Sequence, residues 1–156
     1  MKRTEPLQVW MFEELATSGK QFKTGDTVRI QIMRTGAWQH QDYGEVVVTE
    51  KTLDNVVKNF NARARGIDLA VDENHEPNHR AMGWIKELYK EGKDALFAVI
   101  ELTALGAKTL SDGAYKYFSP EITFRKKDEE TGREVRDLLV GGAFTNRPFF
   151  KAMTPL

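Results

Sequence analysis

Alternation of apolar and polar residues predicts that strands dominate this chain. In Asp26 to Met33, the apolar residues Val28, Ile30 and Ile32 occupy every second position. A period of two is typical of a strand with one face in the core and the other in solvent. We therefore expect a half-buried strand over 26–33.

Two further pairs of strand-like segments are each joined by a short polar turn. The first pair is 82–89 and 95–102, and the second is 115–125 and 134–144. Short polar turns between strands favour antiparallel hairpins. Additional strands are expected at 7–12, 45–49 and 67–71, whereas 34–44 is expected to be an irregular connection.

Two segments have the spacing of helices. Residues 52–65 carry an apolar stripe at helical spacing, formed by Leu53, Val56, Val57, Phe60 and Ala64. Thr49 or Thr52 can cap the beginning of this helix, and Gly66 can end it. A shorter helix is expected between Thr103, as its cap, and Gly113.

Because strands outnumber helices and short turns join most of them, the expected fold is mainly β. It is an antiparallel barrel or curled sheet with two helices packed outside. The 156 residues suffice for one domain with its own core. No linker divides the chain, so we expect a single domain over 1–156 with loose tails at 1–6 and about 149–156.

Composition excludes several classes of protein. Lys+Arg and Asp+Glu both number 23, so the basic excess that is usual for a nucleic-acid binder is missing. Cysteine is absent, which excludes disulfides, thiolate catalysis and zinc sites built on sulfur, and suits a cytosolic protein. The sequence has no stretch typical of a secretory signal or a membrane-spanning helix.

The candidate chemistry begins with a serine and a histidine. Ser119 lies late in the strand-like segment 115–125, and His75 lies just after another. A serine hydroxyl becomes a nucleophile when an adjacent base takes its proton. Pro120 cannot donate a hydrogen bond to a neighbouring strand, so the strand is expected to be an edge or to be bulged there. The alternative is an ordinary exposed serine before a strand proline.

Carboxylates surround the histidine in sequence, and one of them, Asp72, could orient the imidazole as the third member of a triad does. A rival interpretation is a zinc site, because His75 to His79 matches the HExxH pattern of zinc proteases. That pattern requires a regular helix, and Pro77 argues against one.

Other polar residues could belong to a site. Glu101 lies inside an apolar strand and either faces solvent or points at the site. Asn146 and Arg147 are donors that could stabilise an oxyanion, or they form a polar turn before Pro148. The pair Gly141 and Gly142 indicates a bulge or a close backbone approach.

Five short segments, in this order, resemble a known family. They are Val71-Asp-Glu-Asn-His75, Ala81-Met-Gly-Trp84, Ile100-Glu-Leu-Thr103, Tyr115-Lys-Tyr-Phe-Ser-Pro120 and Ala143-Phe-Thr-Asn-Arg-Pro148. Each is weak alone, but together they resemble the I protein of phage Mu and its prophage relatives, a prohead maturation protease. The resemblance covers roughly residues 25–150.

This resemblance implies a β-barrel with helices outside, distantly related to the herpesvirus assemblins. It implies a serine endopeptidase that needs no cofactor, with Ser119 as nucleophile and His75 as base. Its substrates would be itself and the scaffold and major capsid precursor proteins inside the prohead, in the host cytoplasm. Because assemblins dimerise, a homodimer or higher self-association is a further expectation. Neither nucleic acid nor a membrane is an expected partner.

The chain departs from the family pattern at the third catalytic residue. Related proteases carry it on the strand after the serine, where this chain has Gly141 or Gly142. Asp72 is the first candidate to replace it, Glu101 is the second, and a Ser-His dyad is also possible. Two other functions stay open, an inactive scaffold-binding module of the prohead and a zinc hydrolase through His75 and His79. Because no helical scaffold region follows Leu156, the chain is expected to be a trimmed product or the protease alone.

Overall fold

A computed structural model describes residues 7–8, 21–40, 44–74, 76, 80–127 and 129–146. They form nine strands and two helices, in the order β1 (Leu7–Gln8), β2 (Thr27–Arg34), β3 (Gly36–His40), β4 (Gly44–Val48), α1 (Glu50–Asn61), β5 (Leu69–Glu73), β6 (Gly83–Glu91), β7 (Ala95–Leu102), α2 (Ala104–Ser111), β8 (Tyr117–Lys127) and β9 (Glu134–Thr145). The mainly β class predicted from the sequence is confirmed for these residues. The expected tails, 1–6 and 149–156, lie outside the described part.

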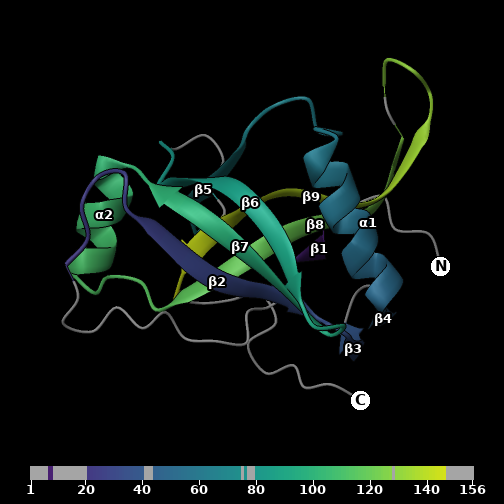
Figure 1. Cartoon of the computed structure of the whole chain (residues 1–156), viewed down its shortest axis with the longest axis horizontal. Coiled ribbons are helices and arrows are strands. Elements are labelled where there is room, and N and C mark those ends of the chain that lie inside the picture. The colour runs from purple at the N-terminus through teal and green to yellow at the C-terminus, as the bar shows by residue number, and fades with distance from the viewer. Residues whose placement is uncertain are drawn as a thin grey trace.

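The main sheet has seven strands in the order β1-β8-β9-β5-β6-β7-β2. It curls, because β2 and β8 lie in contact although the hydrogen-bonding order places them near opposite edges. Figure 1 shows the curled sheet with α1 and α2 at opposite ends of the molecule. The chain therefore forms a half-barrel in which the two hairpins predicted from the sequence, β6–β7 and β8–β9, supply most of the wall.

The sheet is mainly antiparallel, as expected, but one of its pairings is parallel. β5 pairs antiparallel with β6 but parallel with β9, with Val71 opposite Gly142 and Glu73 opposite Phe144. Parallel neighbours need a long crossover connection, and about 60 residues separate these two strands in the chain. The predicted beginning of this strand also shifts, because Ile67 lies before β5 with 58% of its surface exposed.

The segment predicted to be an irregular connection contains a strand. β3 pairs with β4 in a separate two-stranded sheet, with Trp38 opposite Val46. Trp38 and Val46 are both buried, so burial of the large indole fixes the register of this hairpin. The glycines and polar residues around Trp38 concealed this short alternation in the sequence.

The first helix begins at its predicted cap but is shorter than predicted. The Thr49 hydroxyl accepts a hydrogen bond from the backbone N–H of Thr52, and the Thr52 side chain accepts one from the N–H of Thr49. This reciprocal pair is a capping box. The helix ends at Asn61, and a turn with Arg63 at φ 53° follows, so Gly66 lies beyond the helix end.

The second helix agrees with its prediction and is packed closely against the segment that enters β6. Thr103 caps α2, and its hydroxyl also donates to the carbonyls of Ala81 and Met82. Gly106 packs so tightly that an added Cβ atom would lie 1.8 Å from the Met82 carbonyl oxygen. The absence of a side chain at Gly106 therefore allows the helix to contact the backbone at Met82.

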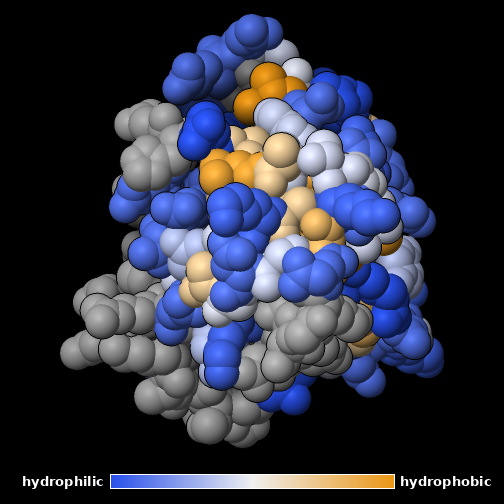
Figure 2. All heavy atoms as spheres, turned by 90° about the vertical axis from the view of Figure 1, so that its left-hand side faces the viewer, coloured by the Kyte–Doolittle hydropathy of each residue, from blue (hydrophilic) through white to orange (hydrophobic). Residues whose placement is uncertain are grey.

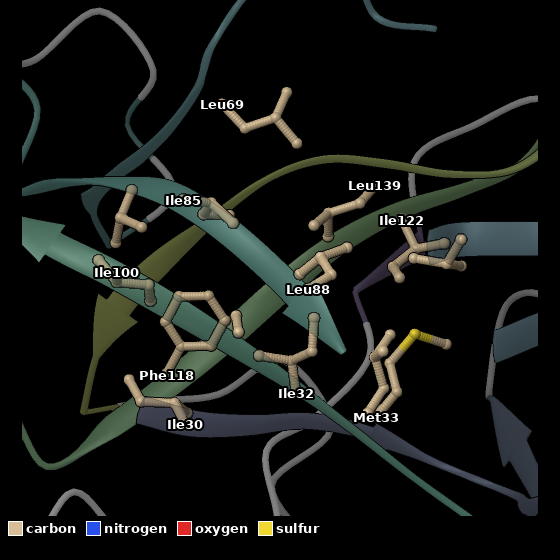
Figure 3. Packing of buried hydrophobic residues seen from close by; sticks show 14 of the residues in the cluster. Ile30, Ile32, Met33, Leu69, Ile85, Leu88, Ile100, Phe118, Ile122 and Leu139 are labelled. Carbon is tan, nitrogen blue, oxygen red and sulfur yellow. The ribbon is translucent and has the colours of Figure 1, made fainter. Parts of the chain in front are cut away.

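The core fills the inside of the curled sheet. Figure 3 shows Ile30, Ile85, Ile100 and Phe118 pointing into one interior from four different strands. Each of these residues is at most 5% exposed. The residues that alternate with them on the same strands face the outer side of the half-barrel, and the candidate site lies on that outer side.

Candidate active site on the outer face of the sheet

Ser119 and Asp72 lie in one row across three neighbouring strands. Ser119 on β8 is opposite Ala143 on β9, and Ala143 is opposite Asp72 on β5. Residues opposite each other in a sheet point to the same face. Since Phe118 points into the core, the Ser119 and Asp72 side chains lie on the outer face.

The spacing of this row suits a bridging residue. Neighbouring strands lie about 4.8 Å apart, so the backbones at Ser119 and Asp72 are separated by roughly 10 Å. A serine hydroxyl and an aspartate cannot bond directly over that span. An imidazole that bonds to one through each ring nitrogen, with hydrogen bonds of about 2.8 Å, would fill it.

The chain turns sharply directly after β5. The Glu76 N–H donates to the Glu73 carbonyl over 3.1 Å, and Asn74 adopts a left-handed conformation with φ 56°. Asn74 follows Asp72 by two residues in the chain, and position 75 comes directly after this turn residue. The placement of His75 itself lies outside the described residues, so its role as base stays a prediction.

The interpretation of Ser119 as an ordinary exposed serine is wrong. Ser119 and its neighbour Ala143 are both 0% exposed. A substrate can therefore reach the Ser119 hydroxyl only when this face of the sheet opens. Burial of a small polar residue beside a strand irregularity is compatible with a special role, whereas an incidental surface serine would be exposed.

The sheet is irregular close to Ser119, but the extra residue is on the neighbouring strand. Glu121 and Ile122 on β8 are opposite Gly141 and Leu139, so Val140 on β9 is the extra residue. β1 pairs with β8 at those same two residues, Glu121 and Ile122. The bulge expected at Pro120 is therefore not on β8, whereas the bulge expected beside Gly141 and Gly142 is confirmed on β9.

Gly142 has a packing explanation. It lies in register with Pro120 and Val71, and its missing side chain would point at the core. A Cβ atom there would lie 2.4 Å from the ring of Phe118. Position 142 consequently cannot supply a third catalytic side chain without displacing Phe118, and the outer-face position beside it is Ala143.

Along the hydrogen-bonded sheet, Glu101 lies farther from Ser119 than Asp72 does. It is on β7, opposite Thr27 on one side and Trp84 on the other. Three strands, β9, β5 and β6, separate β7 from β8 in the order of the sheet, whereas only β9 separates β5 from β8. The strand pairing therefore places Asp72 in one row with Ser119 and leaves Glu101 outside that row.

The two predicted oxyanion donors cannot be treated alike. The Asn146 side chain accepts a hydrogen bond from the Lys116 N–H and donates one to the Ala114 carbonyl. It thereby fastens the segment that enters β8, three residues before Ser119. Arg147 lies outside the described residues, and an oxyanion role for either residue stays a prediction.

An open depression adjoins the end of β5 and α2. It is lined by Glu73, Asn74, Thr109, Ala114, Tyr115 and Asn146. Burial and the nearby carboxylates of Glu73 and Glu76 raise the pKa of the Tyr115 hydroxyl, which also hydrogen-bonds to Glu73. Because its pKa is raised, the Tyr115 hydroxyl stays neutral at physiological pH.

Figure 2 looks onto the α2 end of the molecule, where hydrophilic residues surround a small group of apolar ones.

The zinc interpretation depends on histidines that the structure does not describe. His75 and His79 lie outside the described residues, as does the side chain of His40. Among the residues that are described, no cluster of three metal-ligating side chains occurs. Neither of the helices in the described part of the chain is long and apolar enough to cross a membrane.

Sequence reasoning missed two residues of this region, Asn74 and Thr145. The Thr145 hydroxyl donates to the Asn74 side-chain oxygen over 2.7 Å, although 71 residues separate them in the chain. A signal was present, because asparagine is one of the few residues that favour a left-handed turn. Both residues lie inside the segments that carry the family resemblance.

Comparison with known proteins identifies one family. The family model described as "Mu-like prophage I protein, N-terminal domain" matches residues 30–156. This range includes most of β2, every later strand and helix described here, and all the candidate residues. It leaves out β1 and the beginning of β2. A search of curated proteins and a search of solved structures each found no match.

Proposed function

We propose that this chain is a serine endopeptidase of phage head maturation. It belongs to the Mu-like prophage I protein family, which is a prohead protease family. Ser119 is the nucleophile, His75 the base and Asp72 the third residue. The substrates are the scaffold and major capsid precursor proteins and the chain's own precursor, cleaved inside the prohead in the host cytoplasm. We also propose that the half-barrel is distantly related in fold to the barrels of the herpesvirus assemblins.

The observation that carries this proposal is the row formed by Ser119, Ala143 and Asp72. It provides a buried hydroxyl and a carboxylate on one face, at a spacing that an imidazole can bridge. The histidine of the family resemblance follows Asp72 by three positions. No other serine among the described residues has such surroundings, since Ser111 on α2 accepts a hydrogen bond from the Phe22 N–H.

The chemistry follows from these roles. His75 takes the Ser119 proton as the Ser119 oxygen attacks the scissile carbonyl, and a tetrahedral oxyanion forms. Backbone N–H groups beside the bulge stabilise the oxyanion. His75 then protonates the leaving amine, and water repeats the attack on the acyl-enzyme, which releases the acid and restores Ser119. Asp72 keeps the imidazole oriented and stabilises its charged form.

A serine-reactive fluorophosphonate tests this assignment on the chain itself. We expect intact mass spectrometry to show one adduct, located at Ser119 by peptide mapping. The adduct should be absent from Ser119→Ala and present in Ser111→Ala, a matched half-buried serine. Folding of each variant is checked by circular dichroism. A folded wild-type chain that gives no adduct at Ser119 would contradict the proposal.

One observation favours a second function, an inactive scaffold-binding module of the prohead. The usual place of the third residue is occupied by Gly141 or Gly142, neither of which has a side chain, and Phe118 packs against Gly142. Such a module would bind scaffold protein equally well as wild type and as Ser119→Ala. The fluorophosphonate experiment separates the two functions, because only the enzyme forms the adduct.

A further inference from the structure

The hydrogen bond between Thr145 and Asn74 joins the ends of two strands beside the candidate site. Thr145 is the last residue of β9 and is 0% exposed, and its hydroxyl donates to Asn74 Oδ1 over 2.7 Å. It lies opposite Tyr117 on β8, two positions from the pair Ser119 and Ala143. Residues two apart on a strand share a face, so this bond lies on the same outer face as Ser119 and Asp72.

Asn74 is held at a second point as well. Its backbone N–H donates to the Phe144 carbonyl over 3.0 Å, which extends the parallel pairing of β5 and β9 by one residue. With φ 56°, Asn74 has a backbone conformation that non-glycine residues seldom adopt unless their surroundings enforce it. The two hydrogen bonds to β9 supply that enforcement.

We propose that Thr145 and Asn74 are positioning residues that fix His75 relative to Ser119. This inference rests on the proposed function. The two residues do not touch the substrate. They set the point at which the chain leaves β5, one residue before His75 in the sequence.

Strand β9 contacts both the residue that carries the nucleophile and the turn that precedes the base. Ser119 is held in register by Ala143, and the turn before His75 is held by Phe144 and Thr145, the next two residues of the same strand. The distance between nucleophile and base therefore depends on three consecutive residues of β9. A shift of about 1 Å in such a distance can cost on the order of 100-fold in rate.

The experiment measures the rate of Ser119 acylation by the fluorophosphonate in four single variants and one double variant. Thr145→Val removes the hydroxyl at constant shape, and Thr145→Ser retains it. Asn74→Gly tolerates the left-handed turn but loses the side-chain acceptor. Thr123→Val is the matched control, because Thr123 is a buried threonine on the same hairpin, beyond the bulge. Reagent concentration is varied so that reagent binding and the acylation step are measured separately.

We expect Thr145→Val and Asn74→Gly each to slow the acylation step by about 10- to 100-fold, with unchanged reagent binding. Thr145→Ser should restore most of the rate, and Thr123→Val should react like wild type. The double variant Thr145→Val/Asn74→Gly should be no slower than either single variant, because both remove the same bond.

Hydrogen exchange of the Asn74 backbone N–H, which donates to the Phe144 carbonyl, gives a readout that does not depend on catalysis. We expect this amide to exchange at least about tenfold faster in Thr145→Val, since local opening becomes easier. Faster exchange together with normal acylation would overturn the positioning role and leave the proposed function intact. Unchanged exchange would overturn the role as well. A wild-type chain that is never acylated at Ser119 would overturn both.

Discussion

At the scale of single residues, the position of one carboxylate distinguishes the possible mechanisms. Asp72 is half-buried on β5, one strand beyond Ala143, whereas Glu101 is on β7 with two further strands between it and β9. Electrostatic stabilisation of an imidazolium falls with distance and is strongest where water is excluded. Both carboxylates are half-buried, and Asp72 is the nearer of the two to Ser119 along the hydrogen-bonded sheet. The choice between them is open to a direct test.

We expect Asp72→Asn to lower the rate of Ser119 acylation on the order of 10³- to 10⁴-fold, because the amide favours the wrong imidazole tautomer. Glu101→Gln is the matched control and should react at a rate close to wild type. The measurement is the single-exponential rate of adduct formation at pH 7, with both variants verified as folded. Equal rates for Asp72→Asn and wild type would favour the Ser-His dyad, and a large loss in Glu101→Gln would reverse the assignment.

At the scale of elements, the contact between α2 and the backbone of Met82, directly before β6, depends on one glycine. Gly106 faces the Met82 carbonyl so closely that a methyl group cannot be placed there without moving the helix. The Thr103 hydroxyl bonds to the same carbonyl, so the helix cannot shift without breaking its own cap.

We therefore expect Gly106→Ala to destabilise the chain by more than about 3 kcal/mol, which is the range of severe overpacking. Lys108→Ala on the exposed side of α2 is the control and should cost no more than about 0.5 kcal/mol, since it removes only a surface pair with Asp112. Urea unfolding followed by circular dichroism measures both. A Gly106→Ala variant as stable as wild type would mean that α2 can lie elsewhere.

α1 is attached to β9 through Asp137. Asn55 on α1 donates to the Asp137 carboxylate over 2.9 Å, and Asn59 donates to the Arg136 carbonyl over 2.6 Å. Asp137 also has a left-handed backbone with φ 57°, which asparagine tolerates equally well. Burial raises the pKa of this carboxyl group, although the Asn55 bond and Arg136 oppose the shift.

This raised pKa gives a signed dependence of stability on pH. The folded state binds the Asp137 proton more tightly than the unfolded state does, so its contribution is fully present below the unfolded pKa. It is lost as pH rises through the folded pKa. We expect Asp137→Asn, which keeps the oxygen that accepts from Asn55, to be at least as stable as wild type at pH 7. The difference should shrink below pH 4. Thermal unfolding between pH 3 and 7 checks this. A variant that is less stable than wild type at pH 7, with a deficit that shrinks at low pH, would show that the charge itself is needed.

The elements differ in how far the sequence could predict them. Both helices and both long hairpins follow from local signals, namely apolar period and caps, and the bulge on β9 follows from the glycine pair Gly141 and Gly142. The pairing of Val71 to Glu73 with Gly142 to Phe144 has no local signal, because it joins segments about 70 residues apart. The row of Ser119 and Asp72 depends on that pairing. Sequence reasoning could therefore nominate both residues but could not bring them together.

At the scale of the whole molecule, the burial of Ser119 makes reactivity a question of opening. The hydroxyl has no exposed surface, so an external reagent must wait for a local opening of the outer face. When opening and closing are fast, the observed rate equals the equilibrium fraction that is open multiplied by the rate of the open form. Denaturant raises that fraction according to the surface that the opening exposes.

We therefore expect low urea concentrations, which leave the chain folded, to accelerate acylation of Ser119 by the fluorophosphonate. The logarithm of the rate should rise linearly with urea, with a slope smaller than that of global unfolding, because a local opening exposes less surface. The rate should then fall near the unfolding midpoint, since the unfolded chain no longer holds a base beside the serine. The measurement is the adduct fraction over time at each urea concentration, with the folded fraction recorded by circular dichroism. A rate that does not depend on urea below the unfolding transition would mean that the nucleophile is already open in solution. A slope equal to that of global unfolding, with no later fall, would mean that the reagent reacts only with unfolded chain, which would contradict a native active site at Ser119.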